Sequence, residues 1–167
     1  MKGQNAVLYG GAYSTNNGMV FDGSDDYIQL DSWGFGDEPF SVEAYVQFNR
    51  FNKWSRIFDF FGDDANADST TDGIDSVVLA NNDETSGISF NIRDSQNNTL
   101  TLLSDGYYLI DKWIHVVCTI DSTYDMKTYV DGNLIAVKTS TYLPPFRKRP
   151  YHWIGSCLLY TSDAADD

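Results

Sequence analysis

Short runs of alternating hydrophobic and polar residues recur along this chain, separated by clusters of Gly, Asn, Asp and Ser. Ser41–Phe48 shows the alternation most clearly, with an apolar side chain at every second position from Val42 to Phe48. A strand of this kind packs one face on a core and exposes the other, which is typical of antiparallel sheets. No segment shows the sustained 3.6-residue period of a helix. The pattern therefore predicts an all-β protein.

The same pattern predicts where the strands lie. Their spacing, with turn residues between them, is typical of a two-sheet sandwich or jelly roll. We expect strands at Ala6–Tyr9, Met19–Phe21, Tyr27–Leu30, Ser41–Phe48, Arg56–Phe61, Ser76–Ala80, Ile88–Ile92, Thr99–Leu103, Trp113–Asp121, Lys127–Val130, Leu134–Lys138 and His152–Ile154.

Trp113–Ile135 predicts a long strand followed by a hairpin. Asp131 and Gly132 lie between two strand-like runs, and this pair is a strong hairpin signal because both central residues of a type I′ turn need a positive φ. Cys118 falls on the apolar face of the first strand, so we expect a buried free thiol. The two cysteines of the chain cannot form a disulfide framework.

Length, composition and charge narrow the class of protein. The 167 residues, 42% of them hydrophobic and 21% charged, suit one globular domain with a real core. The net charge of −13 argues against nucleic acid or an anionic membrane surface as a partner. No apolar run approaches the ~20 residues of a membrane span, and the N-terminal residues lack the apolar core of a signal peptide.

Three segments together resemble the laminin G-like jelly roll of the concanavalin A-like lectin/glucanase superfamily: Gly18–Leu30, Phe40–Phe48 and Trp113–Ile135. The shorter Arg56–Asp59 and His152–Gly155 fit the same pattern in the same order. The resemblance implies a two-sheet antiparallel jelly-roll sandwich over residues 1–156 that commonly binds carbohydrate or protein. Such domains usually carry a closing strand after the last of these segments, so we expect the domain to be truncated at its C-terminal end.

The last residues do not continue the strand-and-turn pattern. Cys157–Asp167 resembles the translation of a sequencing-library adapter, so we expect residues 157–167 to be a non-native tail; a natural flexible acidic tail is the alternative. The chain would then be a fragment of a larger multidomain protein, placed outside the cell, at the cell surface or in a virion.

Asp22, Asp25 and Asp26 form a tight acidic turn between two expected strands. Ca²⁺ takes six to eight oxygen ligands, and this turn offers several at once. The resemblance also implies a structural Ca²⁺ near this turn. The alternative is a turn whose Asp side chains hydrogen-bond their own backbone, with no metal.

Two further charged segments are expected to be solvated surface. Gly62–Asp75 holds five aspartates, but their spacing lacks the EF-hand pattern, so a mobile loop is the favoured interpretation. Arg147-Lys148-Arg149 is a small basic patch in a Pro-bounded loop, and we expect it to face solvent.

Sugar binding needs exposed aromatic rings beside amide and carboxylate hydrogen-bonding groups. The loop-borne candidates are Trp33, Trp54, Tyr107, Tyr108, Tyr124 and Tyr142. Packing in the core or at an edge is the alternative for each of them. Glu43, Tyr45 and Gln47 share the polar face of their expected strand, which is either ordinary solvated sheet or part of a binding surface.

Catalysis is weakly supported. A retaining glycosidase needs two carboxylates about 5–5.5 Å apart, and no expected strand presents two acidic residues at alternate positions. His115, inside a strand, is expected to be structural. We therefore predict a non-catalytic module that binds a glycan, with Ca²⁺ as a candidate cofactor. The alternative is a structural or adhesion domain of a viral tail or cell-surface assembly that contacts a surface protein, and a glycoside hydrolase is the third hypothesis.

Overall fold

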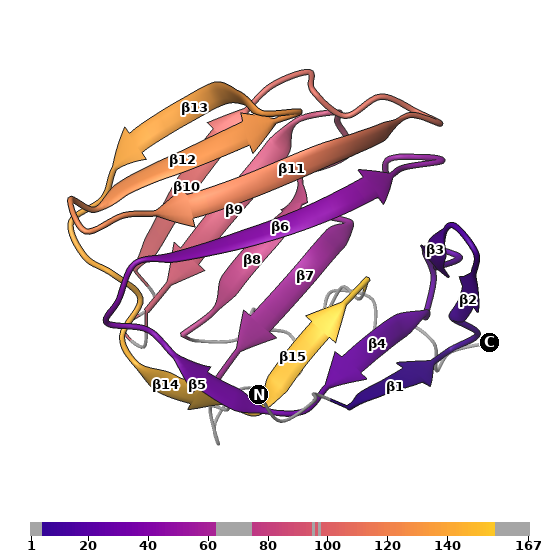
Figure 1. The fold of residues 1–167 in the computed structure, drawn as a ribbon, viewed down its shortest axis with the longest axis horizontal. Coiled ribbons are helices and arrows are strands. Elements are labelled where there is room, and N and C mark those ends of the chain that lie inside the picture. The colour runs from indigo at the N-terminus through magenta and orange to yellow at the C-terminus, as the bar shows by residue number, and fades with distance from the viewer. Residues whose placement is uncertain (1–4, 63–74, 95, 97, 156–167) are drawn as a thin grey trace.

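The computed structural model describes residues 5–62, 75–94, 96 and 98–155. Within these residues two antiparallel sheets pack face to face, with two short strand pairs at their periphery (Figure 1). The predicted Cys157–Asp167 tail and nearly all of the predicted Gly62–Asp75 loop lie outside the described residues. The part of the chain that the structure describes contains no apolar helix of membrane-spanning length.

The larger sheet has seven strands and the smaller one four. In order across the larger sheet the strands are β1 (Ala6–Tyr9), β4 (Tyr27–Leu30), β15 (Tyr151–Ile154), β7 (Arg56–Phe61), β8 (Val77–Asn81), β9 (Ile88–Arg93) and β10 (Thr99–Ser104). Across the smaller sheet they are β13 (Asn133–Thr139), β12 (Asp125–Val130), β11 (Trp113–Ile120) and β6 (Phe40–Gln47). The peripheral pairs are β14 (Arg147–Arg149) with β5 (Trp33–Phe35), and β2 (Tyr13–Thr15) with β3 (Gly18–Val20).

The core lies between β8 and β9 of one sheet and β11 and β12 of the other. Leu79 and Phe90 are fully buried, and so are Cys118 and Met126 from the facing sheet. Figure 1 shows β15, β4 and β1 lying beyond β6, the last strand of the smaller sheet. The inward residues of β6, such as Val42, are accordingly only half-buried.

The predicted fold class is confirmed: the described chain is an all-β, two-sheet antiparallel sandwich. Every predicted strand is present, three of them with the predicted bounds and the others differing by one or two residues at one or both ends. The prediction missed β2, β5 and β14. Each has three residues, and β5 pairs with β14 from a distant part of the chain, so local alternation carries no signal for them.

The predicted hairpin is also confirmed. β12 and β13 are joined by Asp131 and Gly132, which have φ values of 47° and 81°. Cys118 is a buried free cysteine, as expected. Burial raises the pKa of its thiol to about 12, so it stays protonated and unreactive at neutral pH.

The expectation that Arg149 faces solvent is wrong. Its side chain is fully buried, and its guanidinium donates hydrogen bonds to the carbonyl oxygens of Asp75 (Nε, 2.5 Å) and Phe35 (Nη1, 2.7 Å). It also lies over the Phe35 ring, 4.2 Å from the centroid. Burial lowers its pKa to about 10, so it remains charged and ties β14 to β5 and to Asp75, two residues before β8.

His152 on β15 is a second fully buried polar side chain. Its ring lies 3.5 Å from the Trp33 ring and 4.8 Å from the Phe60 ring, measured between centroids. Neither ring nitrogen makes a well-formed hydrogen bond, although backbone groups of Arg149 and Trp33 favour the protonated imidazole. Burial lowers the pKa of the imidazole to about 4, with the nearby Arg149 charge acting in the same direction.

This pKa predicts a loss of stability in mild acid. The unfolded chain takes up a proton at His152 near pH 6.5, whereas the folded chain resists it until about pH 4, so stability falls as the pH drops through this window. We expect the free energy of unfolding to fall by about 2 kcal/mol between pH 7 and pH 5 from this group alone. His152→Phe should remove most of that dependence in urea titrations, and His115→Gln, at the exposed histidine, should preserve it. An equal slope in both variants would contradict the assignment.

Candidate functional site

The outward face of the larger sheet carries a polar hollow. Because side chains alternate along a strand, β8 and β9 direct Leu79 and Phe90 into the core and the residues between them outward. The hollow has a volume of about 220 Å³. It is lined by Trp54, Arg56, Ser76, Val78, Ala80, Asn91, Arg93, Thr99 and Thr101.

The floor of the hollow offers hydrogen-bonding groups fixed by their neighbours. Asn91 donates from Nδ2 to the Ser89 hydroxyl (2.8 Å), and this leaves its amide oxygen to accept. Arg93 donates from Nε to the Thr99 hydroxyl (3.2 Å). Amide, guanidinium and hydroxyl groups beside an indole ring are the combination that a pyranose needs, because its hydroxyls require partners while its C–H face packs on an aromatic ring.

A buried ion pair lies beside this floor. Arg56 and Asp59 on β7 form a salt bridge, and both side chains are almost completely buried. Asp59 pairs with Val78 across the strands and therefore shares its outward direction. Charged groups this deeply buried are stable only when paired, so this pair holds the β7 side of the hollow in place.

Trp54 reaches the edge of the hollow from the loop between β6 and β7. Its backbone has a φ of 53°, and its N–H donates to the carbonyl oxygen of Asp83 (3.0 Å). Asn81 at the end of β8 is fully buried and donates from Nδ2 to the carbonyl oxygens of Asn52 (2.9 Å) and Asp83 (2.7 Å). One buried amide thus fastens the Trp54 loop to the loop between β8 and β9.

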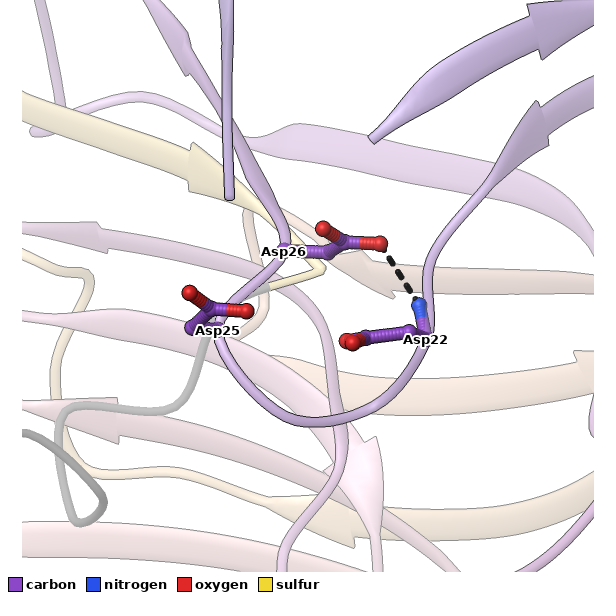
Figure 2. A group of neighbouring side chains, drawn as sticks. All are labelled: Asp22, Asp25 and Asp26. Carbon is purple, nitrogen blue, oxygen red and sulfur yellow. Dashed lines mark hydrogen bonds between the residues drawn. The ribbon is translucent and has the colours of Figure 1, made fainter. Parts of the chain in front are cut away.

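The predicted acidic turn brings its three carboxylates together. One carboxylate oxygen from each of Asp22, Asp25 and Asp26 lies within 4.8 Å of the others. Figure 2 shows the side chains of Asp22 and Asp26 pointing toward each other across the turn. The Asp22 N–H donates to Asp26 Oδ2 (2.7 Å), and the Ser24 N–H donates to Asp22 Oδ1 (2.7 Å). Asp22 and Asp26 therefore do hydrogen-bond the backbone of their own turn, as the alternative interpretation expects. The other carboxylate oxygens of the group are left available to bind an ion.

The acidic turn contacts the Trp54 loop directly. Arg50 donates from Nη2 to the carbonyl oxygen of Asp22, and Asn52 donates from Nδ2 to that of Gly23, each at 3.0 Å. On its other side the turn packs against Gly10, where a Cβ would lie only 2.5 Å from the carbonyl oxygen of Asp25. The turn, the Trp54 loop and the hollow therefore form one continuous region at one end of the sandwich.

The aromatic residues predicted to bind ligand do not gather at one place. Tyr107 is exposed and hydrogen-bonds the β8–β9 loop, on which Trp54 also rests. Tyr124 is exposed in the turn between β11 and β12, at the other end of the sandwich. Tyr142 is half-buried there and donates from its hydroxyl to the Asn98 carbonyl (3.1 Å), and burial raises the pKa of this phenol. Of the six candidates, Trp54 alone lines the hollow.

Two of the six aromatic residues pack against the core, as the alternative interpretation expects. Tyr108 is only 1% exposed and packs against Phe48 in the core, so the prediction that it contacts a ligand is wrong. Burial raises the pKa of its phenol well above the usual value. Trp33 is half-buried against His152 and Phe60. Both lie in segments that look like loops but cover the core.

Sequence reasoning missed the floor of the hollow. The floor lies on β9 and β10 and includes Asn91, Arg93, Thr99 and Thr101. The alternation of residues in these two strands was used only to locate the strands. The signal lay in the outward positions, where Ser89, Asn91 and Arg93 alternate with buried apolar residues.

A family model described as the concanavalin A-like lectin/glucanases superfamily matches residues 22–159. This chain belongs to that superfamily, and its fold is the one that the sequence resemblance implied. A search of curated protein sequences finds no significant match.

Comparison with solved structures agrees on the fold. The CBM40 domain of the Ruminococcus gnavus IT-sialidase gives a TM-score of 0.59 at 12% identity, over 80% of this chain and 79% of that one. The binding domain of botulinum neurotoxin serotype D gives 0.60 at 14% identity over 92% of this chain, which spans only 43% of the toxin domain. The carbohydrate-binding module CBM66 of Bacillus subtilis gives a TM-score of 0.51 at 13% identity, over 89% of this chain and 90% of that one.

The contact between Gly10 and the acidic turn predicts a position-specific cost. The backbone at Gly10 is left-handed (φ 76°), a conformation that alanine adopts only at a cost. Gly10→Ala would also place a Cβ 2.5 Å from the carbonyl oxygen of Asp25. Gly132→Ala is the matched control, because Gly132 has a φ of 81° but nothing within 4 Å of its Cβ position. We expect Gly132→Ala to cost about 1 kcal/mol of unfolding free energy, and Gly10→Ala to cost at least about twice as much. Equal losses in urea titrations would show that the turn does not constrain Gly10.

Proposed function

We propose that this chain is a non-catalytic glycan-binding module of a larger protein exposed at a cell surface or on a virion. The observation that carries the proposal is the hollow over β7–β10, where Trp54 stands beside the fixed polar groups of Asn91 and Arg93. The superfamily and the presence of two carbohydrate-binding modules among its structural neighbours support this function.

The absence of catalysis is part of the proposal. Glu43 on β6 is the carboxylate whose strand resembles the superfamily pattern most closely. It lies opposite His115, with Oε2 3.2 Å from Nε2, and both side chains are largely exposed on the outer face of the smaller sheet. A glycosidase would need a second carboxylate across a bound sugar. Glu43 is instead placed to pair with a histidine, which supports binding without hydrolysis.

Replacing Trp54 tests the glycan site. Trp54→Ala removes the aromatic wall of the hollow, and we expect it to weaken glycan binding roughly 5- to 10-fold. Tyr124→Ala is the matched control, since it removes an exposed aromatic ring at the other end of the sandwich and should leave binding unchanged.

The measurement is a glycan array followed by calorimetric titration with the best glycan. Binding to no glycan, or equal weakening by both variants, would contradict the proposed site. Hydrolysis of β-glucans above background would contradict the proposed lack of catalysis.

We further propose that Asp22, Asp25 and Asp26 hold a structural Ca²⁺. Two oxygens that share one Ca²⁺ at 2.3–2.6 Å lie at most about 5.2 Å apart, and the three carboxylates meet this condition within 4.8 Å. Carboxylates are the donors that Ca²⁺ prefers, so the donor set fits. The bound ion would order the turn that Arg50 and Asn52 contact, and so would support the Trp54 loop.

Calcium should stabilise the fold. At a Ca²⁺ concentration 100 times the dissociation constant, the expected gain in unfolding free energy is about 2.7 kcal/mol, visible as a higher Tm than in a chelator. Asp25→Asn should remove most of this gain because it takes a charged ligand from an exposed position in the turn. Asp105→Asn, at an exposed aspartate in another loop, is the control. Equal Tm values with Ca²⁺ and with chelator would contradict the ion site.

A protein-contacting structural or adhesion domain is the second candidate function. The outer face of the smaller sheet favours it, because Tyr45 (66% exposed) and Trp113 (39% exposed) stack there with 5.2 Å between ring centroids. Leu134 (54% exposed) and Val137 (56% exposed) lie on β13, at the opposite edge of the same sheet. Tyr45→Ser with Trp113→Ser should abolish attachment of the parent assembly if this function is correct, while leaving glycan binding at the hollow intact.

A further inference from the structure

Asn81 is a polar side chain in an otherwise apolar row of the core. Every second residue of β8 faces the opposite sheet, and Asn81 follows Val77 and Leu79 in this row. It pairs with Ile88 of β9, and all four residues are fully buried. Burying an amide costs stability unless its hydrogen bonds offset the loss of water. The partners of Asn81 therefore indicate what this position does.

Both donors of Asn81 reach the loops that cover this end of the core. Its Nδ2 donates to the carbonyl oxygens of Asn52 (2.9 Å), Asp83 (2.7 Å) and Thr85 (3.3 Å). Its backbone N–H donates to the carbonyl oxygen of Ser55 (3.2 Å). Three carbonyl groups around Nδ2 settle the orientation of the amide, because they would repel its oxygen. Among the described residues the Oδ1 atom has no hydrogen-bond partner, so the amide acts here through its donors.

These hydrogen bonds lie on both sides of Trp54 in the chain. Asn52 precedes Trp54 and Ser55 follows it, and the Ser55 hydroxyl donates to the Asn52 carbonyl oxygen (3.2 Å). The N–H of Trp54 itself donates to the Asp83 carbonyl oxygen, which Asn81 also holds. Between these points Trp54 has a φ of 53°, which is uncommon for a large side chain and persists only where neighbouring contacts hold it. Asn81 supplies several of those contacts.

We propose that Asn81 is a positioning residue for the glycan site. It keeps Trp54 at the wall of the hollow and so raises the affinity for a sugar that Asn81 itself does not contact, since it is buried and does not line the hollow. Without its donors the loop populates conformations in which Trp54 leaves that wall, and the apparent affinity falls with the fraction of molecules that remain competent. This inference rests on the proposed function for its ligand, whereas the order of the Trp54 side chain can be measured without any ligand.

The first measurement is made on the whole chain without a sugar. The heteronuclear NOE and line width of the Trp54 indole N–H report its motion, and Trp54→Ala assigns the signal. We expect an ordered indole in the wild type and a mobile one in Asn81→Ala, which removes the side-chain donors. Asn81→Leu should have the same effect, and its apolar side chain suits the core row if the alanine variant folds poorly. Thr128→Ala is the control, because it truncates a buried side chain of β12 in the opposite sheet and should leave the indole ordered.

The second measurement is a double-mutant cycle with Trp54→Ala. The probes are methyl β-D-glucopyranoside and methyl β-D-galactopyranoside, titrated by NMR. We expect Asn81→Ala to weaken binding about threefold to fivefold when Trp54 is present, and less than about 1.5-fold in the Trp54→Ala background. A residue that merely stabilises the fold would give the same ratio in both backgrounds. Thr128→Ala should leave the affinity unchanged in both.

The two measurements separate this inference from the proposed function. An indole as ordered in both Asn81 variants as in the wild type, or equal weakening with and without Trp54, would overturn the positioning role. Failure of the wild type to bind either sugar would count against the glycan site, and the indole measurement would then decide the role of Asn81 by itself.

Discussion

The packing of β8 and β9 on β11 and β12 determines where the rest of the molecule can place its side chains. Leu79 and Phe90 are completely excluded from water, and so are Val116 and Met126 opposite them. A slip of one residue in any of these strands would exchange its buried and outward faces, at a cost of several buried apolar side chains. The polar row that forms the floor of the hollow therefore points outward because the apolar row beside it must point inward.

The loops at one end of the sandwich are coupled through Asn81. Its buried amide holds the carbonyl oxygens of Asn52 and Asp83, and Asn52 in turn donates to the acidic turn at Gly23. These hydrogen bonds connect the acidic turn to the loop that carries Trp54. An ion at the turn would then affect the hollow by limiting how the Trp54 loop moves, without contacting a bound sugar.

The sequence predicted the fold well because period-two alternation is a local property. Ser41–Phe48 and Trp113–Asp121 show this alternation clearly. Asp131-Gly132 indicated the hairpin because both central residues of its turn need a positive φ. The acidic turn was found because its three aspartates are neighbours in sequence. Arg149 was wrongly predicted to face solvent because its partners are the backbone carbonyl groups of Phe35 and Asp75, far from it in sequence. No local pattern of residues indicates such a contact. The hollow was missed because the outward polar residues of β9 show a local pattern, but nothing in that pattern joins them to a tryptophan in a distant loop.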